Sequence, residues 1–225
     1  MKPRATPNKK KTEEPETGAD GKGPDGKGGE TRERILKAAE DLLRRHGPAK
    51  TTVVDVARAL EMSHANVYRH FASKAELQDA VADRWLKAIS GPLQKIAHGK
   101  GPYAKAGAST RLEQWVLALA AAKQRKVLDD PELFATYHAV AVAARHVAES
   151  HVAELRDQVG AIIRDGVAQG EFKVADPDAA AMAVLSATIR FHHPYHVKES
   201  AGRIDQGQIR TVLKLVLAGL RSGAL

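Results

Sequence analysis

Apolar residues recur every three or four positions along most of this chain, the spacing that gathers side chains on one face of an α-helix. No segment alternates apolar and polar residues in the manner of a β-strand. Gly47-Pro48 should end a helix and Gly91-Pro92 should break or kink one, because proline lacks the N–H that a helix interior requires. The pattern therefore predicts an all-α fold of about nine helices. Their expected ranges are residues 31–46, 52–60, 64–71, 73–90, 109–127, 131–142, 148–169, 177–190 and 205–221.

Two short helical patterns separated by a three-residue turn occupy residues 51–74. Thr52 and Ser63 precede the two helices, and their hydroxyls can accept hydrogen bonds from the free N–H groups of each first turn. The turn itself is Glu61-Met62-Ser63. This arrangement predicts a helix-turn-helix with a small core of its own. The apolar positions that would close that core are Val53, Val56, Ala57, Leu60, Val67 and Phe71.

The second of these helices carries a polar and aromatic outward face, which suits insertion into a DNA groove. Its N-terminal residues, beginning with His64, would reach base edges first. Asn66 can bond adenine, Arg69 can bond guanine or a phosphate, and Ala65 can touch a thymine methyl group. The alternative is a solvated face on an ordinary small helix, but the caps and the turn in register favour DNA. The side chains better placed for phosphate oxygens are Tyr68, His70 and Lys74.

With Tyr68-Arg69-His70-Phe71 followed by Ser73-Lys74, this segment resembles the helix-turn-helix of the TetR family of bacterial transcriptional regulators. The resemblance implies a DNA-binding domain over residues 30–76 and a helical effector-binding and dimerisation domain over residues 77–225. Glu61 stands where the family usually has glycine, so Glu61 must either avoid a positive φ or bear its steric cost, and the last residues of the preceding helix should adjust. The residues that the resemblance places on the DNA are Thr52, Val54, His64, Ala65, Asn66, Tyr68, Arg69, His70 and Lys74.

The last two expected helices carry apolar residues on more than one face, which indicates a second partner surface besides the core of the chain. Several alanines in the first of them would permit close helix approach. We expect the pair to form a four-helix bundle across a two-fold axis in a homodimer. The alternative is that both are central core helices of one monomer. The interface candidates are Ala183, Ala187, Leu213 and Leu217.

Aromatic and histidine residues on several C-terminal helices could line an apolar pocket whose few polar groups would bind a small molecule. The alternative is that these side chains are ordinary core residues. His192 and His196 have a spacing that could hold a metal, but Pro194 interrupts that turn and no carboxylate is near in sequence, so no metal site is expected. The pocket candidates are Trp115, Phe134, Tyr137, His138, Phe191 and His192.

Composition narrows the classes of protein that fit. The 225 residues carry a formal net charge of +8, which favours anionic partners such as nucleic acid. The absence of cysteine excludes disulfides, thiol catalysis and cysteine metal sites. No apolar run is long enough for a membrane span and no signal peptide is recognisable, so a cytoplasmic location without a membrane partner is expected. Residues 1–29 are rich in lysine, glutamate, glycine and proline and are expected to be a disordered tail.

These features favour a ligand-responsive transcriptional regulator, specifically a repressor that binds a palindromic operator as a dimer and is released by a small-molecule inducer. An enzyme with a DNA-binding head is the first alternative. The sequence offers it no glycine-rich phosphate loop, no paired carboxylates and no nucleophile with a base, and it implies no cofactor. A DNA-binding scaffold without a small-molecule ligand is the second alternative, and the sequence does not separate it from the regulator.

Overall fold

Helices account for the regular structure of the residues that the computed structural model describes, which are 24–129, 131–200 and 205–223. The predicted all-α class is therefore confirmed. Most of the tail expected at residues 1–29 lies outside the described residues. The α-helices are α1 (Pro24–Lys50), α2 (Val53–Ala59), α3 (His64–Tyr68), α4 (Lys74–Ala97), α5 (Ala108–Asp129), α6 (Pro131–Ala143), α7 (Arg145–Ala168), α8 (Pro177–His192), α9 (Pro194–Glu199) and α10 (Gln206–Ser222), and a 3-10 turn, η1 (Gly101–Tyr103), follows α4.

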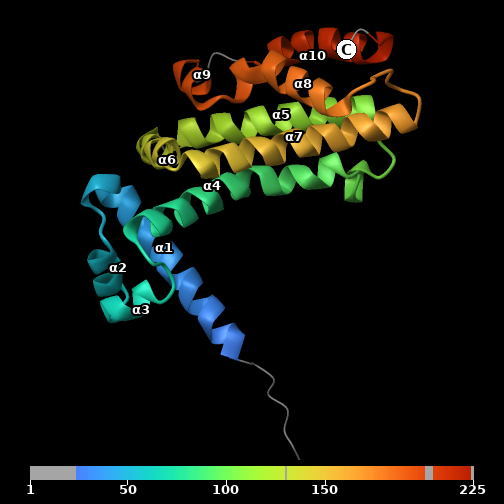
Figure 1. Cartoon of the computed structure of the whole chain (residues 1–225). Helices are drawn as coiled ribbons and strands as arrows, with labels where there is room; N and C mark the ends of the chain where they lie inside the picture. The colour runs from blue at the N-terminus through green and yellow to red at the C-terminus, as the bar shows by residue number, and fades with distance from the viewer. Residues whose placement is uncertain (1–23, 130, 201–204, 224–225) are drawn as a thin grey trace, which may run out of the picture.

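The first three helices form a small unit at one end of the molecule, and α4 leads from it into a larger helical part (Figure 1). Val67 of α3 and Phe71 after it are fully buried against Val56 of α2 and Ile35 of α1, where the apolar spacing placed them. The Arg32 guanidinium lies 4.7 Å from the centre of the Phe71 ring, a cation–π distance. The small unit thus has a core of its own, which holds the short α3 in place.

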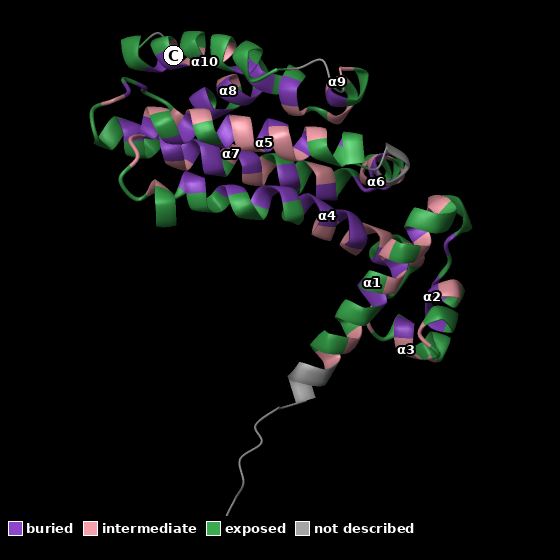
Figure 2. Ribbon diagram, turned by 180° about the vertical axis from the view of Figure 1, so that it is seen from behind, coloured by how far each residue is buried: buried purple, intermediate pink, exposed green. Residues whose placement is uncertain are grey.

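In the larger part, α4, α5 and α7 pack side by side, and α8 with α10 covers the side away from α4 (Figures 1 and 2). The buried residues in Figure 2 form a continuous layer between these helices. α6 contacts both α1 and α4, so the larger part touches the small unit directly as well as through α4. None of the described helices is both long and apolar enough to cross a bilayer.

α4 continues through Gly91-Pro92 to Ala97, so of the expected break or kink the helix does not break at residue 90. Proline inside a helix costs about 3 kcal/mol. Leu93 and Ile96 are buried beyond it, and burial of each side chain contributes about 1.5–3 kcal/mol. Ser90 Oγ also donates to Glu154 Oε2 of α7 at 2.8 Å. Packing against α5 and α7 therefore outweighs the hydrogen bond that Pro92 cannot donate.

The ends of other helices also differ from the predicted ones. α1 begins at Pro24 instead of residue 31, so the helix includes the last part of the expected tail. Pro24 is compatible with a first helical position, because a backbone N–H at that position has no partner within the helix and proline lacks one. Gly47 leaves the helical conformation at φ 73°, as its sequence context predicted. α3 is shorter than expected and ends at Tyr68, while α7 begins at Arg145.

Candidate nucleic-acid interface

Side-chain caps fix the first residues of α2 and α3. Thr52 Oγ1 accepts a hydrogen bond from the Asp55 N–H at 3.2 Å, and Asp55 Oδ2 accepts one from the Thr52 N–H at 3.1 Å. These bonds with Thr52 hold the pKa of the Asp55 carboxyl below its usual value. Ser63 Oγ accepts from the Asn66 N–H at 3.3 Å. Both predicted caps are confirmed. They fix where each helix begins, and therefore which side chains of α3 face solvent.

The turn between α2 and α3 strains one residue. Glu61 adopts φ 53°, in the left-handed region that favours glycine. The Met62 N–H donates to Ala57 O at 3.0 Å and the Glu61 N–H donates to Arg58 O at 3.2 Å, the bond pattern of a Schellman cap. Of the two expected outcomes, Glu61 therefore bears the steric cost of a positive φ and does not avoid it. The cap and the buried junction of α2 with α3 impose the backbone conformation, although Glu61 carries a Cβ.

Glu61→Gly should raise the free energy of unfolding by about 1 kcal/mol, because glycine adopts the left-handed conformation without the steric cost of a Cβ. Denaturant unfolding monitored by circular dichroism measures the change. Glu61→Ala is the matched control, since it removes the same carboxylate and keeps the Cβ. Equal stabilities for the glycine and alanine variants would show that the backbone here is unstrained.

The surface around α3 is open to solvent. Tyr68 is 50% exposed and Val54 is 38% exposed. All nine candidate DNA residues have some surface to offer a partner. Exposed candidates are Thr52, Val54, His64, Ala65, Tyr68 and Arg69, and partly buried ones are Asn66, His70 and Lys74.

Two of the nine candidates have polar atoms already engaged within the chain. The Thr52 hydroxyl donates to Asp55 Oδ2 at 2.6 Å, and Asn66 Nδ2 contacts Met62 Sδ at 3.8 Å. Asn66 would have to leave this weak contact before its amide could pair with adenine. The side chains that lie free at the N-terminal and outward side of α3 are those of His64 and Arg69, which makes them the better candidates for contacts with base edges.

A basic groove between α1 and α2 was missed by the sequence analysis. It has a volume of about 300 Å³ and is open to solvent. Arg34, Lys37 and Arg45 line it from one face of α1, with Asp41 between them. The signal was present as cationic residues at helical spacing, but charges on a helix surface usually indicate no more than solvation. The remaining lining residues are Ala38, Leu42, Ala59 and Leu60.

Three of the six pocket candidates in the larger part come together, and they do so around a tryptophan that the sequence analysis did not single out. The Trp85 ring of α4 stacks on Tyr137 with centroids 4.9 Å apart and an interplanar angle of 3°. It meets Phe134 edge-on at 6.1 Å, and Phe134 stacks on His138 at 6.3 Å. Burial raises the pKa of the Tyr137 hydroxyl. This cluster joins α6 to α4.

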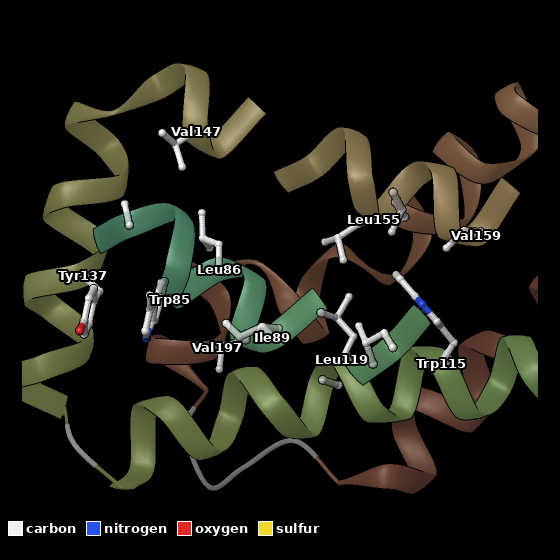
Figure 3. Close-up of a cluster of buried hydrophobic side chains, with 14 of the residues drawn as sticks. Trp85, Leu86, Ile89, Trp115, Leu119, Tyr137, Val147, Leu155, Val159 and Val197 are labelled. Atoms are coloured by element: carbon white, nitrogen blue, oxygen red, sulfur yellow. The ribbon is translucent and has the colours of Figure 1, made fainter. Parts of the chain in front are cut away.

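The other pocket candidates lie elsewhere. Trp115 is fully buried on α5, well apart from the Trp85–Tyr137 stack (Figure 3), and its Nε1 donates to Gln158 Oε1 at 2.8 Å. Phe191 is buried on α8, and the partly buried His192 beside it has Nε2 3.3 Å from Leu185 O. The described residues include no group of three or more side chains arranged to hold a metal ion.

The four interface candidates separate into two kinds. Ala187 is exposed and Ala183 partly exposed on α8, whereas Leu213 and Leu217 are 1% and 8% exposed within the single chain. The two leucines therefore pack into the core of their own chain, which corrects their assignment to a partner surface. The large apolar residues that do face outward on α8 and α10 are Met182 (44% exposed), Ile189 (44%) and Leu215 (75%).

Comparisons with known proteins match both parts of the chain. Residues 35–81 match the family profile described as bacterial regulatory proteins, tetR family, and residues 108–213 match that of the tetracyclin repressor-like C-terminal domain. The HTH-type transcriptional repressor Rv3405c of Mycobacterium tuberculosis is 37% identical over 68 residues, 30% of this chain and 34% of that protein. The alignment thus spans about a third of this curated relative.

Solved structures resemble the chain over most of its length. A transcriptional regulator of the TetR/AcrR family from Thermobifida fusca has a TM-score of 0.58 at 21% identity, covering 85% of this chain and 99% of its own. The transcriptional regulator FadR of Bacillus subtilis, solved in complex with stearoyl-CoA, has a TM-score of 0.55 at 14% identity, covering 83% and 98%. At these identities the likeness supports the fold alone, with the small unit of α1, α2 and α3 joined to a larger helical part.

Proposed function

The chain belongs to the TetR family of bacterial regulatory proteins, and on that premise we propose that it is a ligand-responsive repressor. It would bind a palindromic operator as a homodimer and leave it when a small-molecule inducer occupies the larger, C-terminal part. The matched Mycobacterium tuberculosis protein is named a repressor, and the Bacillus subtilis neighbour was solved with a small molecule, stearoyl-CoA. Both parts of the proposal therefore have precedents among similar proteins.

The observation that carries the DNA-binding part is the exposed face of α3. Five residues form a helix too short to be stable alone, and the buried Val67 and Phe71 hold it against α1 and α2. Apart from the partly buried Asn66, its other side chains are exposed, and so is that of Arg69 directly after the helix. A rigidly held short helix with a polar and cationic exposed face is what the major groove accepts.

In this proposal α4 and α6 transmit the effect of a bound effector to the unit formed by α1, α2 and α3, called the reader unit below. α4 begins directly after α3 and is buried along most of its length against α5 and α7. Gln158 of α7 ties these helices together, because its Nε2 donates to Ser90 O of α4 at 3.1 Å while its Oε1 accepts from Trp115 of α5. A ligand that changes the packing around α5 and α7 would therefore shift α4, and with it the spacing of two reader units.

The proposed dimer uses the outward face of α8 and α10. These helices contact each other on the side of the molecule away from α4 (Figure 1). Met182, Ile189 and Leu215 would pack against the same residues of a second copy, as an interface across a two-fold axis requires. Ala183 and Ala187 lie between Met182 and Ile189 along the sequence of α8, and their small side chains would let the helices approach closely.

Lys74→Ala should weaken binding to every DNA sequence alike and reduce the steepness of its salt dependence by about one unit in the slope of log K against log salt, since one phosphate contact is lost. Fluorescence anisotropy with an operator and an unrelated duplex, over a series of salt concentrations, measures both slopes.

Lys95→Ala is the matched control, because Lys95 is exposed at the other end of the same helix, far from the reader unit. Its slope should equal that of the wild type. An unchanged slope in the Lys74 variant would remove Lys74 from the set of phosphate contacts.

A further inference from the structure

A lysine amine is buried in the core of the larger part without an acidic partner. Lys123 of α5 is 4% exposed, and its Nζ lies 3.3 Å from His151 Nε2 of α7. No carboxylate of the described residues lies within ion-pair distance of this amine, whereas the buried Arg111 on the same helix pairs with Asp165 at 2.9 Å. Buried charges in proteins are normally paired, so a buried lysine without a carboxylate partner is unusual.

The hydrogen bonds around Lys123 leave donors without acceptors. An ammonium group has three N–H donors and no acceptor, so in its bond with His151 it donates to Nε2. The proton of the neutral His151 ring must then be on Nδ1, and this buried atom has no hydrogen-bond partner. The other N–H donors of the Lys123 ammonium have no acceptor among the described residues, and His151 Nδ1, on the far side of the ring from the amine, is a further unpaired donor.

Further groups around the amine have matching chemistry. His192 of α8 is a third basic residue, and burial and then the charge of Lys123 lower the pKa of its ring. The Trp85 ring centre lies 5.9 Å from Lys123 Nζ, and Trp85 belongs to the aromatic cluster with Phe134 and Tyr137. A cationic, donor-rich group thus adjoins an apolar aromatic surface.

We propose that this place, defined by Lys123, His151 and Trp85, binds the carboxylate of an acidic small molecule whose apolar body packs on the aromatic cluster. The carboxylate oxygens accept hydrogen bonds from the remaining N–H groups of the Lys123 ammonium, which pairs the buried charge. The inference rests on the proposed function, because it assigns a chemical class to the inducer.

Binding at this place also suggests how the inducer acts. The amine is almost fully buried, so a carboxylate reaches it only when the surrounding helices move apart. Trp85 is part of α4, which continues from the reader unit. Separation of α4 from α5 and α7 at Trp85 would therefore change the position of α3.

Matched pairs of acids and amides test the assignment. The full chain is mixed with 4-phenylbutyrate or octanoate, or with the primary amide of each, and melting temperature and dissociation constant are measured. Each acid should raise the melting temperature and bind at least roughly tenfold more tightly than its amide, since a charge-assisted hydrogen bond is lost with the amide. Lys123→Met should abolish this preference, and the exposed Lys126→Met control should keep it.

His151→Leu provides a second variant, which removes the hydrogen-bond acceptor that orients the Lys123 ammonium and should also weaken acid binding. Equal affinity for acid and amide, no binding of either acid, or a preference that survives Lys123→Met would overturn the assignment. Operator binding is measured separately. A chain that releases its operator with an uncharged compound but ignores both acids would retain the proposed function and lose this inference, whereas a chain that binds no DNA would lose the proposed function.

Discussion

Leu215→Glu will leave the chain folded but monomeric and will weaken operator binding by roughly 10²- to 10⁴-fold, the gain expected from linking two half-site contacts. Leu215 is 75% exposed in the single chain, so a charge there costs the monomer little. In a dimer packed through α8 and α10 the same charge would be buried without a partner, which is strongly unfavourable. Light scattering gives the oligomeric state, and anisotropy titration gives the affinity.

Two comparison variants separate interface from folding. Val142→Glu places a charge on an equally apolar residue of α6 that is 61% exposed, and it should leave assembly and affinity unchanged. Leu213→Glu should unfold the chain instead of dissociating it, because Leu213 is 1% exposed in its own core. A Leu215→Glu protein that remains dimeric with full affinity would place the interface on another face.

Lys123→Met will stabilise the protein by about 3 kcal/mol near pH 7. Burial lowers the pKa of the Lys123 amine from 10.5 to about 8 in the folded chain. At about 1.4 kcal/mol for each tenfold change in proton affinity, keeping this amine charged inside the core carries a cost of that size. Methionine fills a similar volume with no charge to bury. Denaturant unfolding of the two proteins measures the difference.

The pH dependence of this difference identifies its cause. Below pH 8 the amine is charged in both the folded and the unfolded chain, so the full cost is present. Between pH 8 and 10.5 the unfolded chain binds the proton and the folded chain has released it, so wild-type stability rises with pH relative to the variant. The difference should fall below about 1 kcal/mol near pH 10. A difference that is independent of pH would show that packing, not charge, causes it, and Lys126→Met should show no difference at all.

The helix-turn-helix could be predicted from sequence because its determinants are local. Thr52 and Ser63 cap the helices they precede, and Val67 and Phe71 fall in the buried phase of α3. The sequence located the strain at Glu61. It could not predict whether the backbone there adopts a positive φ, since that depends on the packing of α2 against α3. Which exposed residues touch DNA stays a prediction.

The larger part was harder to predict because α10 carries Leu215 outside its apolar stripe as well as the leucines within it. The spacing gave Leu213 and Leu217 as readily as Leu215, and only the packing of α10 on its neighbours shows which face is outward. The buried polar groups did leave a signal. Lys123 and His151 are in phase with the apolar stripes of their helices, and a polar residue in that phase is buried.

Selection of bound duplexes from a pool of random DNA, with the full chain at moderate salt, shows directly whether the protein binds an operator as a dimer. We expect enrichment of an inverted repeat whose half-sites lie about 10 base pairs apart, one turn of the double helix, because two copies of α3 would enter successive major grooves. The Arg69→Ala protein should enrich a repeat with relaxed preference at a defined position in each half. Recovery of no inverted repeat by the wild-type chain would contradict the account.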